Sequence, residues 1–372
     1  MIDSSRLSIF FVLPALAPGG AERVSITLLK YLDRSKFQLT LVVINSKVDT
    51  LLDEVPEDVE LISLQYLRVR NALPALFRLV WRRKPDLVFS NLGYLNLAFS
   101  MIRPFLPQGV RIIGRESSIV SEVQKSRAYP KLWNWAYSHF YKKLDGVVCQ
   151  SNFMADDLFL NFSVPKNKIE VINNPIDIGR VNELSSSTLE QEYLNDEIIR
   201  FVAVGRLVNV KGFKLLFEAL AKLTFHSWEL ALVGSGPLES ELRNQADLLN
   251  LSNKIKFIGY KKNPYILMKH ADACILSSYY EGFPNVVLES LACGTPVIAT
   301  PAIGGTVEIL SGVEGCFIAT EVGANSLADA ITCWLNTRRK KVSKSVVAKY
   351  DVRTITKKYE NYFLFVCQAV KA

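Results

Sequence analysis

Short apolar runs alternate with longer stretches of helical periodicity in the first half of the chain. The runs predict strands at residues 8–13, 37–44, 59–64, 87–90, 110–113, 146–150 and 170–172, and the periodic stretches predict helices at 21–31, 72–83 and 129–143. In the first helix, Val24, Leu28 and Tyr31 recur at spacings of four and three. Strand–helix alternation of this kind predicts a parallel, doubly wound sheet.

The same alternation restarts in the second half. It predicts strands at 200–204, 228–233, 255–258, 273–276 and 297–299, helices at 213–223, 238–250 and 285–293, and an amphipathic helix at 355–370. Between the halves, Asn173-Asn174-Pro175 ends the first pattern, and the polar stretch 176–197 is the predicted linker.

The predicted fold is therefore α/β, with two Rossmann-like domains facing each other across a cleft. We expect an N-terminal domain at residues 1–175 and a C-terminal domain at 198–354. In open α/β sheets, ligands bind beyond the carboxyl ends of the strands. The turns that follow the predicted strands are therefore the places to look for chemistry.

The N-terminus carries an ambiguous signal. Arg6, the apolar run 9–13 and Ala15-Leu16-Ala17 imitate a signal peptide with a cleavage site. We expect a buried first strand instead, because the run leads straight into a glycine turn and a helix. No stretch of 18 or more apolar residues occurs elsewhere, so no transmembrane helix is predicted.

Composition narrows the class of protein only a little. The chain has 372 residues, of which 49% are hydrophobic and 22% charged, enough apolar mass for two globular cores. A net charge of +8 suits anionic partners such as nucleotide phosphates, lipid headgroups or nucleic acid, and does not choose among them. Six scattered cysteines without a CxxC pair indicate buried thiols in a reducing cytosol and no metal site.

Two glycine turns follow predicted strands. Gly19 and Gly20 come after the first strand, where backbone amides and a helix N-terminus could approach a phosphate. Gly234 begins a similar turn in the second half. The first turn is not a P-loop, because no Gly-Lys-Ser/Thr follows its glycines. A tight turn without a ligand explains either one nearly as well.

A basic pair follows another strand. Arg206 lies just beyond the predicted strand 200–204, and Lys211 comes five residues later at the next helix start. Together they offer a forked donor and a point charge to a diphosphate, which must be neutralised when it leaves in a transfer reaction. A solvated surface is the alternative for this pair alone.

Two glutamates eight residues apart form the most specific pattern. Glu281 precedes Gly282-Phe283-Pro284, which opens a helix, and Glu289 lies about one turn into that helix. The helix N-terminus can face a phosphate, Glu281 can reach a sugar hydroxyl, and Glu289 can accept hydrogen bonds from ribose.

These motifs resemble those of the family-4 retaining glycosyltransferases of the GT-B fold, whose hallmark is Glu-x7-Glu. Gly205-Arg206-Leu207 with Lys211-Gly212 is similar to the family's donor-phosphate motif, and Gly19-Gly20-Ala21-Glu22-Arg23 to its N-terminal glycine loop. The matching motifs span residues 18–305, most of the chain.

The resemblance implies roles for particular residues. Arg206 and Lys211 would bind the diphosphate, Glu289 the ribose, and Glu281 would lie near the donor sugar. The backbone near Tyr260 would meet the base. The donor pocket would further include Gly234, Gly282 and the amides of Phe283, Asn285 and Val286. The N-terminal domain would bind the acceptor and the C-terminal domain the nucleotide sugar. The C-terminal helix, residues 355–372, would pack back on the N-terminal domain.

One departure from the family pattern concerns a histidine that many members carry in the N-terminal domain. Here that region contains Arg115 and Glu116 and no histidine, so these two residues are candidates for contacting the donor sugar or the acceptor. Glu116 is therefore included among the catalytic candidates. The three histidines, His139, His226 and His270, are expected to be structural.

Two segments of the N-terminal domain suggest an anionic membrane surface. Residues 61–85 contain six basic residues and no acid, interleaved with leucines and aromatics, and residues 129–143 add aromatics that end in Lys142-Lys143. Ordinary helices packed on one side are the alternative.

The sequence therefore predicts a retaining, metal-independent glycosyltransferase that moves a hexose or N-acetylhexosamine. The expected donor is a UDP-sugar, with GDP open, and the expected acceptor a polyprenyl-diphosphate-linked saccharide in polysaccharide assembly, such as O-antigen or capsule. We expect a cytoplasmic, peripheral enzyme at the inner face of the plasma membrane, with no cofactor and no nucleic acid. The absence of an Asp-x-Asp motif agrees with metal independence.

Two alternatives remain. A sugar-nucleotide epimerase of similar fold would need cleft histidines, and the three in this chain are poorly placed. A non-enzymatic basic binding module leaves the paired glutamates and the glycine turns unexplained.

Overall fold

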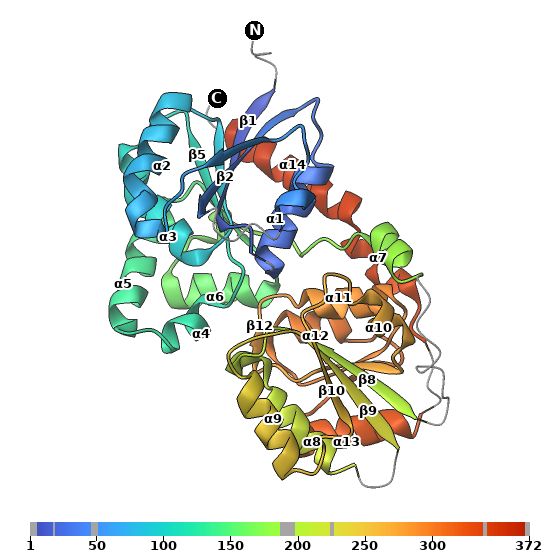
Figure 1. Cartoon of the computed structure of the whole chain (residues 1–372). Helices are drawn as coiled ribbons and strands as arrows, with labels where there is room; N and C mark the ends of the chain where they lie inside the picture. Colours follow the sequence, from blue (N-terminus) through green and yellow to red (C-terminus); the bar gives the residue numbers. More distant parts are fainter. Residues whose placement is uncertain are drawn as a thin grey trace. The chain divides into compact units, whose positions relative to one another are not determined.

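The computed structural model describes residues 6–17, 19–45, 51–186, 198–223, 227–337 and 341–368. It divides into two compact units, one formed by residues 1–175 with 352–372 and the other by residues 176–351. Each unit is built on a parallel sheet flanked by helices (Figure 1). The predicted class, two Rossmann-like α/β domains, is therefore confirmed, while the cleft between them stays a prediction.

The sheet of unit 1 is entirely parallel and has the order β3-β2-β1-β4-β5-β6-β7. Its strands are β1 (Leu7–Ala15), β2 (Phe37–Asn45), β3 (Glu60–Ser63), β4 (Leu87–Ser90), β5 (Arg111–Arg115), β6 (Gly146–Cys149) and β7 (Ile169–Val171). β1 lies between β2 and β4, so the run that imitated a signal peptide is a central strand. The order reverses between β1 and β4, which makes this the switch point of the sheet.

Helices cover the faces of this sheet and pack by their apolar stripes. They are α1 (Gly20–Tyr31), α2 (Val69–Arg83), α3 (Gly93–Ile102), α4 (Val120–Lys125), α5 (Pro130–Phe140), α6 (Asn152–Phe162) and α14 (Val352–Gln368), with 3₁₀ turns at Leu52–Glu54, Arg103–Phe105, Tyr141–Lys143 and Lys166–Lys168. α14 lies beside α1 on the sheet and shares a core with β1 and β2 (Figure 1).

Aromatic packing and a carboxylate attach α14 to unit 1. The fully buried ring of Phe363 meets the ring of Phe89 edge-on, with centroids 5.2 Å apart. One oxygen of Glu360 accepts the Asp33 backbone N–H at 3.1 Å, and the other accepts the Lys36 ammonium at 3.4 Å. The C-terminal helix thus belongs to unit 1, and it begins at Val352.

Unit 2 contains a six-stranded parallel sheet in the order β10-β9-β8-β11-β13-β15 and a small two-stranded sheet of β12 and β14. The strands are β8 (Ile199–Val204), β9 (Trp228–Val233), β10 (Ile255–Gly259), β11 (Ala273–Leu276), β12 (Tyr280–Glu281), β13 (Val297–Ala299), β14 (Ile303–Gly304) and β15 (Phe317–Ile318). The helices are α7 (Ile178–Leu184), α8 (Phe213–Ala221), α9 (Glu239–Leu248), α10 (Tyr265–His270), α11 (Asn285–Ala292), α12 (Gly305–Leu310) and α13 (Ala324–Leu335), with 3₁₀ turns at Asn209–Lys211 and Lys344–Tyr350.

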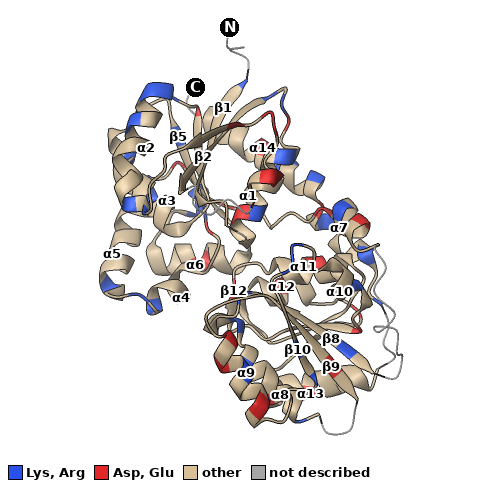
Figure 2. Cartoon of the chain, in the orientation of Figure 1, with Lys and Arg blue, Asp and Glu red and all other residues tan. Residues whose placement is uncertain are grey.

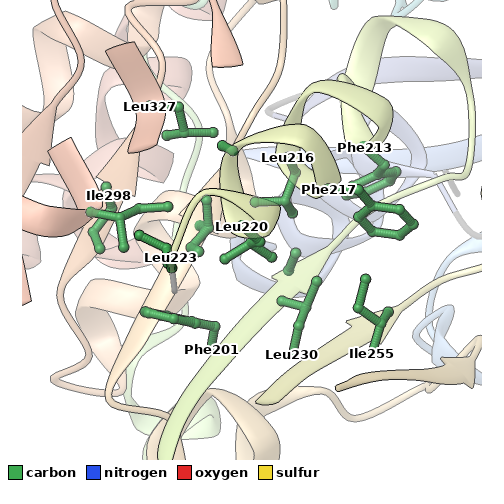
Figure 3. Packing of buried hydrophobic residues seen from close by; sticks show 14 of the residues in the cluster. Phe201, Phe213, Leu216, Phe217, Leu220, Leu223, Leu230, Ile255, Ile298 and Leu327 are labelled. Carbon is green, nitrogen blue, oxygen red and sulfur yellow. The ribbon is translucent and has the colours of Figure 1, made fainter. Parts of the chain in front are cut away.

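The larger core of unit 2 lies where α8 and α13 cover the sheet. Leu216 and Leu220 of α8 point onto Phe201 of β8 and Leu230 of β9 (Figure 3). Trp334 of α13 closes this core, its ring centroid 5.9 Å from that of Phe201. Burying so much apolar surface fixes the strands from which the loops of the site emerge.

The predicted linker differs from the structure. Residues 176–186 belong to unit 2, where α7 packs through buried Val181 into a core shared with α10 and α11. The Asp177 carboxylate caps this helix by accepting the Arg180 N–H at 2.9 Å, and Asn263 donates a side-chain hydrogen bond to the Leu184 carbonyl. Residues 187–197 lie outside the described residues.

All six cysteines are free thiols, and three of them, Cys149, Cys274 and Cys293, are buried. Cys333 is exposed, contrary to the general expectation of burial. Burial raises the pKa of the Cys274 thiol to about 12, which keeps it protonated and unreactive. Within the part of the chain that the structure describes, no helix is both long and apolar enough to cross a membrane.

We predict that Phe363→Ala destabilises unit 1 by about 3–5 kcal/mol, because it empties the aromatic cluster that holds α14. Phe365→Ala on the same helix is the matched control. Its side chain is 65% exposed, so we expect a change below about 0.5 kcal/mol. Urea unfolding measures both. Equal stabilities of the two variants would contradict the described packing of α14.

Candidate active site

The switch point of the second sheet brings two loops together. In this sheet β8 lies between β9 and β11, and the strand order reverses between β8 and β11. The loops that follow β8 and β11 are therefore neighbours at the carboxyl edge of the sheet. Arg206 and Lys211 lie in the loop after β8, and Glu281 lies in the loop after β11. Three of the predicted site residues therefore share one edge of the sheet.

An ion pair joins the two loops. The Lys211 ammonium lies 2.6 Å from Oε1 of Glu281, and the Ser278 hydroxyl donates to the same oxygen at 2.7 Å. The Lys211 and Glu281 side chains are 22% and 12% exposed, so the pair is accessible to a ligand. No hydrogen bond from the described residues reaches Oε2 of Glu281. That oxygen is available to an incoming hydroxyl group.

Backbone contacts fix the distance between these loops. Gly212 has a φ of +63°, and a Cβ there would overlap the carbonyl oxygen of Ser277. The Ser277 hydroxyl donates to the Lys211 carbonyl at 2.8 Å, and the Tyr279 N–H donates to the Val210 carbonyl at 2.9 Å. Only glycine permits both the left-handed backbone and the close approach. The position of Lys211 therefore follows from the local backbone.

The helix that carries Glu289 begins just after Glu281. β12 pairs with β14, and α11 starts at Asn285, so the amides of Asn285 and Val286 lie in a first helical turn, where amides lack intrahelical acceptors. Glu289 is in the second turn and accepts the Tyr265 hydroxyl at 3.4 Å. Phe283 is buried, and its ring lies 5.4 Å from that of Tyr350.

Other predicted donor residues of unit 2 also follow strands of this sheet. Gly234 follows β9, and a Cβ on it would overlap the Gly205 carbonyl, so the loops after β8 and β9 also touch. Tyr260 follows β10 and is 46% exposed. The Arg206 side chain is exposed and has no hydrogen bond or ion pair to any residue that the structure describes. Its guanidinium is therefore not occupied by a carboxylate of the protein.

In unit 1 the glycine loop begins a helix, as predicted. Gly19 is the N-cap of α1, and Gly20 is its first residue. A Cβ on Gly19 would overlap the Glu22 carboxylate, so this side chain folds back over the start of the helix. A carboxylate at a helix N-terminus interacts favourably with the helix dipole. In this structure the Glu22 carboxylate thus lies at the helix N-terminus, where the motif predicted a phosphate.

Arg115 does not fit the prediction that it contacts a ligand. It is fully buried, and its guanidinium donates to Asn91 Oδ1 at 2.5 Å, to the Tyr359 hydroxyl at 3.0 Å and to Asn174 Oδ1. It therefore connects the end of β5 to α14. The physical reason is that its donors are already used inside the unit, where a substrate cannot reach them.

Glu116 is also buried, with 3% of its surface exposed. Its Oε1 accepts the Tyr141 hydroxyl and the Asn96 side-chain amide, the latter at 3.0 Å. Loss of solvent raises the pKa of this carboxyl from its ordinary value of 4.5 to about 7, although the Asn96 hydrogen bond opposes the shift. Near neutral pH this carboxyl is therefore partly protonated.

The structure describes two of the three histidines that were expected to be structural. His139 stacks on Trp135 with ring centroids 5.4 Å apart, and His270 ends α10. Burial lowers the pKa of His270. His226 lies outside the described residues. Among the residues that the structure places, no group of three His, Cys, Asp or Glu side chains could hold a metal.

The sequence interpretation assigned no role to several residues that shape this site. Ser277 and Ser278 directly follow β11, and Tyr265 lies in α10. A polar pair at the carboxyl end of an apolar strand was the available signal for the serines. Nothing in the sequence pairs Tyr265 with Glu289, because 24 residues separate them and no common motif includes both.

Glu116 gives a prediction about stability and pH. The folded pKa of about 7 exceeds the unfolded value of 4.5, so the folded state holds the proton more tightly between these pH values. The stabilisation that protonated Glu116 gives the folded state is fully present below pH 4.5. It is lost as the pH rises through 7.

Glu116→Gln cannot ionise and should therefore gain about 3 kcal/mol relative to the native chain over that range. Urea unfolding of both chains from acid to neutral pH measures the difference, in which other titrating groups cancel. Parallel stability curves would show that Glu116 titrates normally.

Comparison with known proteins adds independent evidence. Residues 18–180 match the model described as Glycosyltransferase Family 4, and residues 187–348 match Glycosyl transferases group 1. The chain is 30% identical over 341 residues to the N-acetylgalactosamine-N,N'-diacetylbacillosaminyl-diphospho-undecaprenol 4-alpha-N-acetylgalactosaminyltransferase of Campylobacter jejuni, covering 89% of this chain and 90% of that protein.

Two further proteins are similar over part or all of their length. An uncharacterized glycosyltransferase of Methanocaldococcus jannaschii is 30% identical over 247 residues, which are 63% of this chain and 60% of that protein. The crystal structure of Anabaena Alr3699/HepE in complex with UDP and glucose superposes with a TM-score of 0.78 at 23% identity, covering 96% of this chain and 99% of that one. At 23% identity, the similarity to HepE shows a shared fold.

The family models, the sequence identity to a named transferase and the shared fold are all consistent with a ligand site in the loops at the carboxyl edge of the second sheet. The family models and the named relative support the transferase class over the epimerase and the non-enzymatic binding module. The chain belongs to the family-4 glycosyltransferases and is a glycosyltransferase enzyme.

Proposed function

We propose that this enzyme is a retaining, metal-independent glycosyltransferase that moves a hexose or N-acetylhexosamine from a UDP-sugar to a polyprenyl-diphosphate-linked saccharide. The product would enter a polysaccharide such as O-antigen or capsule. The observation that carries the proposal is the Lys211–Glu281 ion pair at the switch point of the second sheet. A cation and an acid held side by side suit a diphosphate and the sugar attached to it.

The donor would lie along the carboxyl edge of this sheet. Lys211 and the unpaired Arg206 would bind the diphosphate, and Oε2 of Glu281 would accept a hydroxyl of the sugar. Glu289 would hold the ribose, and the backbone at Tyr260 the base. The pocket would also use Gly234, Gly282 and the amides of Phe283, Asn285 and Val286. HepE, which has this fold, was crystallised with UDP and glucose, which supports the choice of nucleotide.

The chemistry would proceed on one face of the sugar. The bond from the anomeric carbon to the leaving phosphate breaks, the acceptor oxygen bonds to that carbon on the same face, and its proton passes to a phosphate oxygen. Negative charge grows on the diphosphate, and two cationic side chains held nearby lower the energy of that state. The backbone of Lys211 is already fixed by its loop, so only its side chain has to reorient toward the diphosphate.

In unit 1, two predictions stay open within the proposal. Gly19 and Gly20 would approach the donor or acceptor phosphate if the Glu22 carboxylate moves from the start of α1. Glu116 lies at the carboxyl end of β5 and would contribute to catalysis as a buried acid. Native turnover of Glu116→Ala would remove it from the reaction.

An anionic membrane surface would bind α2 and its neighbours. Arg68, Arg70, Arg78 and Arg82 are exposed and have no ion pair to the described residues, whereas Arg83 pairs with Glu60. Figure 2 shows basic residues along this helix. Four unpaired arginines, three on α2 and one at its N-cap, favour attraction to lipid phosphates.

Unit 1 also has exposed apolar side chains on α2, in the 3₁₀ turn Arg103–Phe105 and on α5. Trp81 of α2 is 45% exposed and donates its indole N–H to the Phe105 carbonyl at 3.0 Å, while the Phe105 ring is 68% exposed. Leu132 and Trp135 of α5 are exposed as well. Aromatic rings near basic residues are typical of interfacial segments. The Campylobacter jejuni relative is named for a diphospho-undecaprenol-linked saccharide, which agrees with a lipid-borne acceptor.

A donor assay tests the proposed chemistry. We expect UDP-sugars to raise the melting temperature of the full chain and UDP to be released slowly without added metal. Lys211→Ala should lower the rate of UDP release about 100-fold, because it removes charge neutralisation at the leaving group. Lys214→Ala is the matched control, since Lys214 pairs with Glu241 on the surface at 2.5 Å. A Lys211→Ala enzyme as active as the control would contradict the assignment.

Vesicle binding tests the membrane surface. Reversing two charges with Arg78→Glu and Arg82→Glu should weaken binding to vesicles containing phosphatidylglycerol about 30-fold, with little effect on phosphatidylcholine vesicles. Lys222→Glu with Lys358→Glu gives the same change in net charge on other exposed surfaces and should cause a smaller loss. Equal losses in the two double variants would show that only net charge matters and would reject α2 as the binding element.

A further inference from the structure

Glu281 is held by two donors of different character. The Lys211 ammonium and the Ser278 hydroxyl both reach its Oε1, at 2.6 Å and 2.7 Å. Lysine carries three rotatable donors on a flexible four-carbon stem, whereas a serine hydroxyl has one donor close to the backbone. The first contact can be redirected by a ligand, and the second cannot move without the loop.

The backbone of Ser278 is itself anchored. The Thr300 hydroxyl donates to the Ser278 carbonyl at 2.6 Å, and the Ser278 residue is 1% exposed. The preceding residue, Ser277, touches Gly212 and donates to the Lys211 carbonyl. Ser278 is therefore a fixed point at the end of β11, three residues before the acid that it contacts.

A bound diphosphate changes the balance at Glu281. It brings at least two negative charges to the Lys211 ammonium, which then divides its donors between the phosphate and the carboxylate. Among the described residues, Ser278 is the one other side chain that donates to Glu281. Without that hydroxyl, the carboxylate would lose its orientation at the stage when the sugar must be held.

We propose that Ser278 is a positioning residue that keeps Glu281 aimed at the donor sugar when Lys211 engages the diphosphate. The inference rests on the proposed function of Lys211 and Glu281. Ser278 touches neither the sugar nor the phosphate, and it acts through the Glu281 carboxylate. Its contribution belongs to the recognition of the sugar and not to that of the nucleotide.

Binding of UDP and of UDP-sugars separates these contributions. For Ser278→Ala in the full chain, we expect the Kd for UDP to stay within about twofold of the native value. The Kd of the UDP-sugar that binds the native chain most tightly, among UDP-glucose, UDP-N-acetylglucosamine and UDP-N-acetylgalactosamine, should rise about tenfold. Ser278→Thr retains the hydroxyl and should recover most of that loss.

Two further variants separate positioning from a general loss of structure. Ser290→Ala removes another buried hydroxyl of unit 2, which donates to the Thr295 carbonyl at 2.9 Å, and it should change the melting temperature without changing the preference for UDP-sugar over UDP. In a Glu281→Gln background, Ser278→Ala should add less than about a twofold effect, because the carboxylate it positions is already gone.

The outcomes are distinguishable. If the native chain binds no UDP-sugar better than UDP, or if Glu281→Gln keeps the native preference, the proposed function of Glu281 fails. If Glu281→Gln loses that preference and Ser278→Ala retains it, the positioning role alone is overturned. Equal losses from Ser278→Ala in the native and Glu281→Gln backgrounds would also overturn it, since the effect would not pass through Glu281.

Discussion

The close approach of the Gly212 backbone to the Ser277 carbonyl is the constraint on which the site depends. It sets the loop after β8 against the loop after β11, and these loops carry the two members of the Lys211–Glu281 pair. A residue with a Cβ at Gly212 would push them apart. The arrangement of charge therefore follows from backbone geometry at a switch point, and the geometry follows from glycine.

In unit 1, hydrogen bonds likewise join the segments that follow the two strands at the switch point, β1 and β4. Because these side chains are buried, their role is different. Asn91, just beyond β4, donates to the Ala21 carbonyl at 2.5 Å and to the Ser25 hydroxyl at 2.6 Å, which joins the elements after β1 and β4. Arg115 extends this network to Tyr359 of α14. The side chains of Ser25, Asn91, Arg115 and Tyr359 are buried and hydrogen-bonded within the unit, so they stabilise it. Lys211, Glu281 and Arg206 keep exposed surface, which suits binding of a ligand.

The sequence was sufficient for most strands because each is a short apolar run that ends in a turn. It was less informative for helices without clear periodicity. α3, Gly93–Ile102, is apolar around most of its circumference, so its pattern does not distinguish it from a buried strand. α6 was also missed, although Ser151 caps it by accepting the Met154 N–H. The polar stretch at residues 176–186 resembled a linker, but its few apolar residues pack into unit 2.

The candidate site, too, was only partly predictable from the sequence. Motif spacing identified Lys211 and Glu281, whereas their mutual contact spans 70 residues and depends on the order of the strands. Arg115 was misjudged because its partner Tyr359 lies 244 residues away, on a helix whose docking position the local sequence does not encode. Burial, which decides whether a charged residue is structural or functional, emerged only with the fold.

The central claim is that Lys211 and Glu281 receive one nucleotide-sugar between them. A crystal structure of the full chain with a UDP-sugar tests it most directly. The account predicts phosphate oxygens within hydrogen-bonding distance of the Lys211 ammonium and a sugar hydroxyl on the Glu281 carboxylate. A nucleotide-sugar bound elsewhere, with the Lys211–Glu281 pair undisturbed, would contradict it.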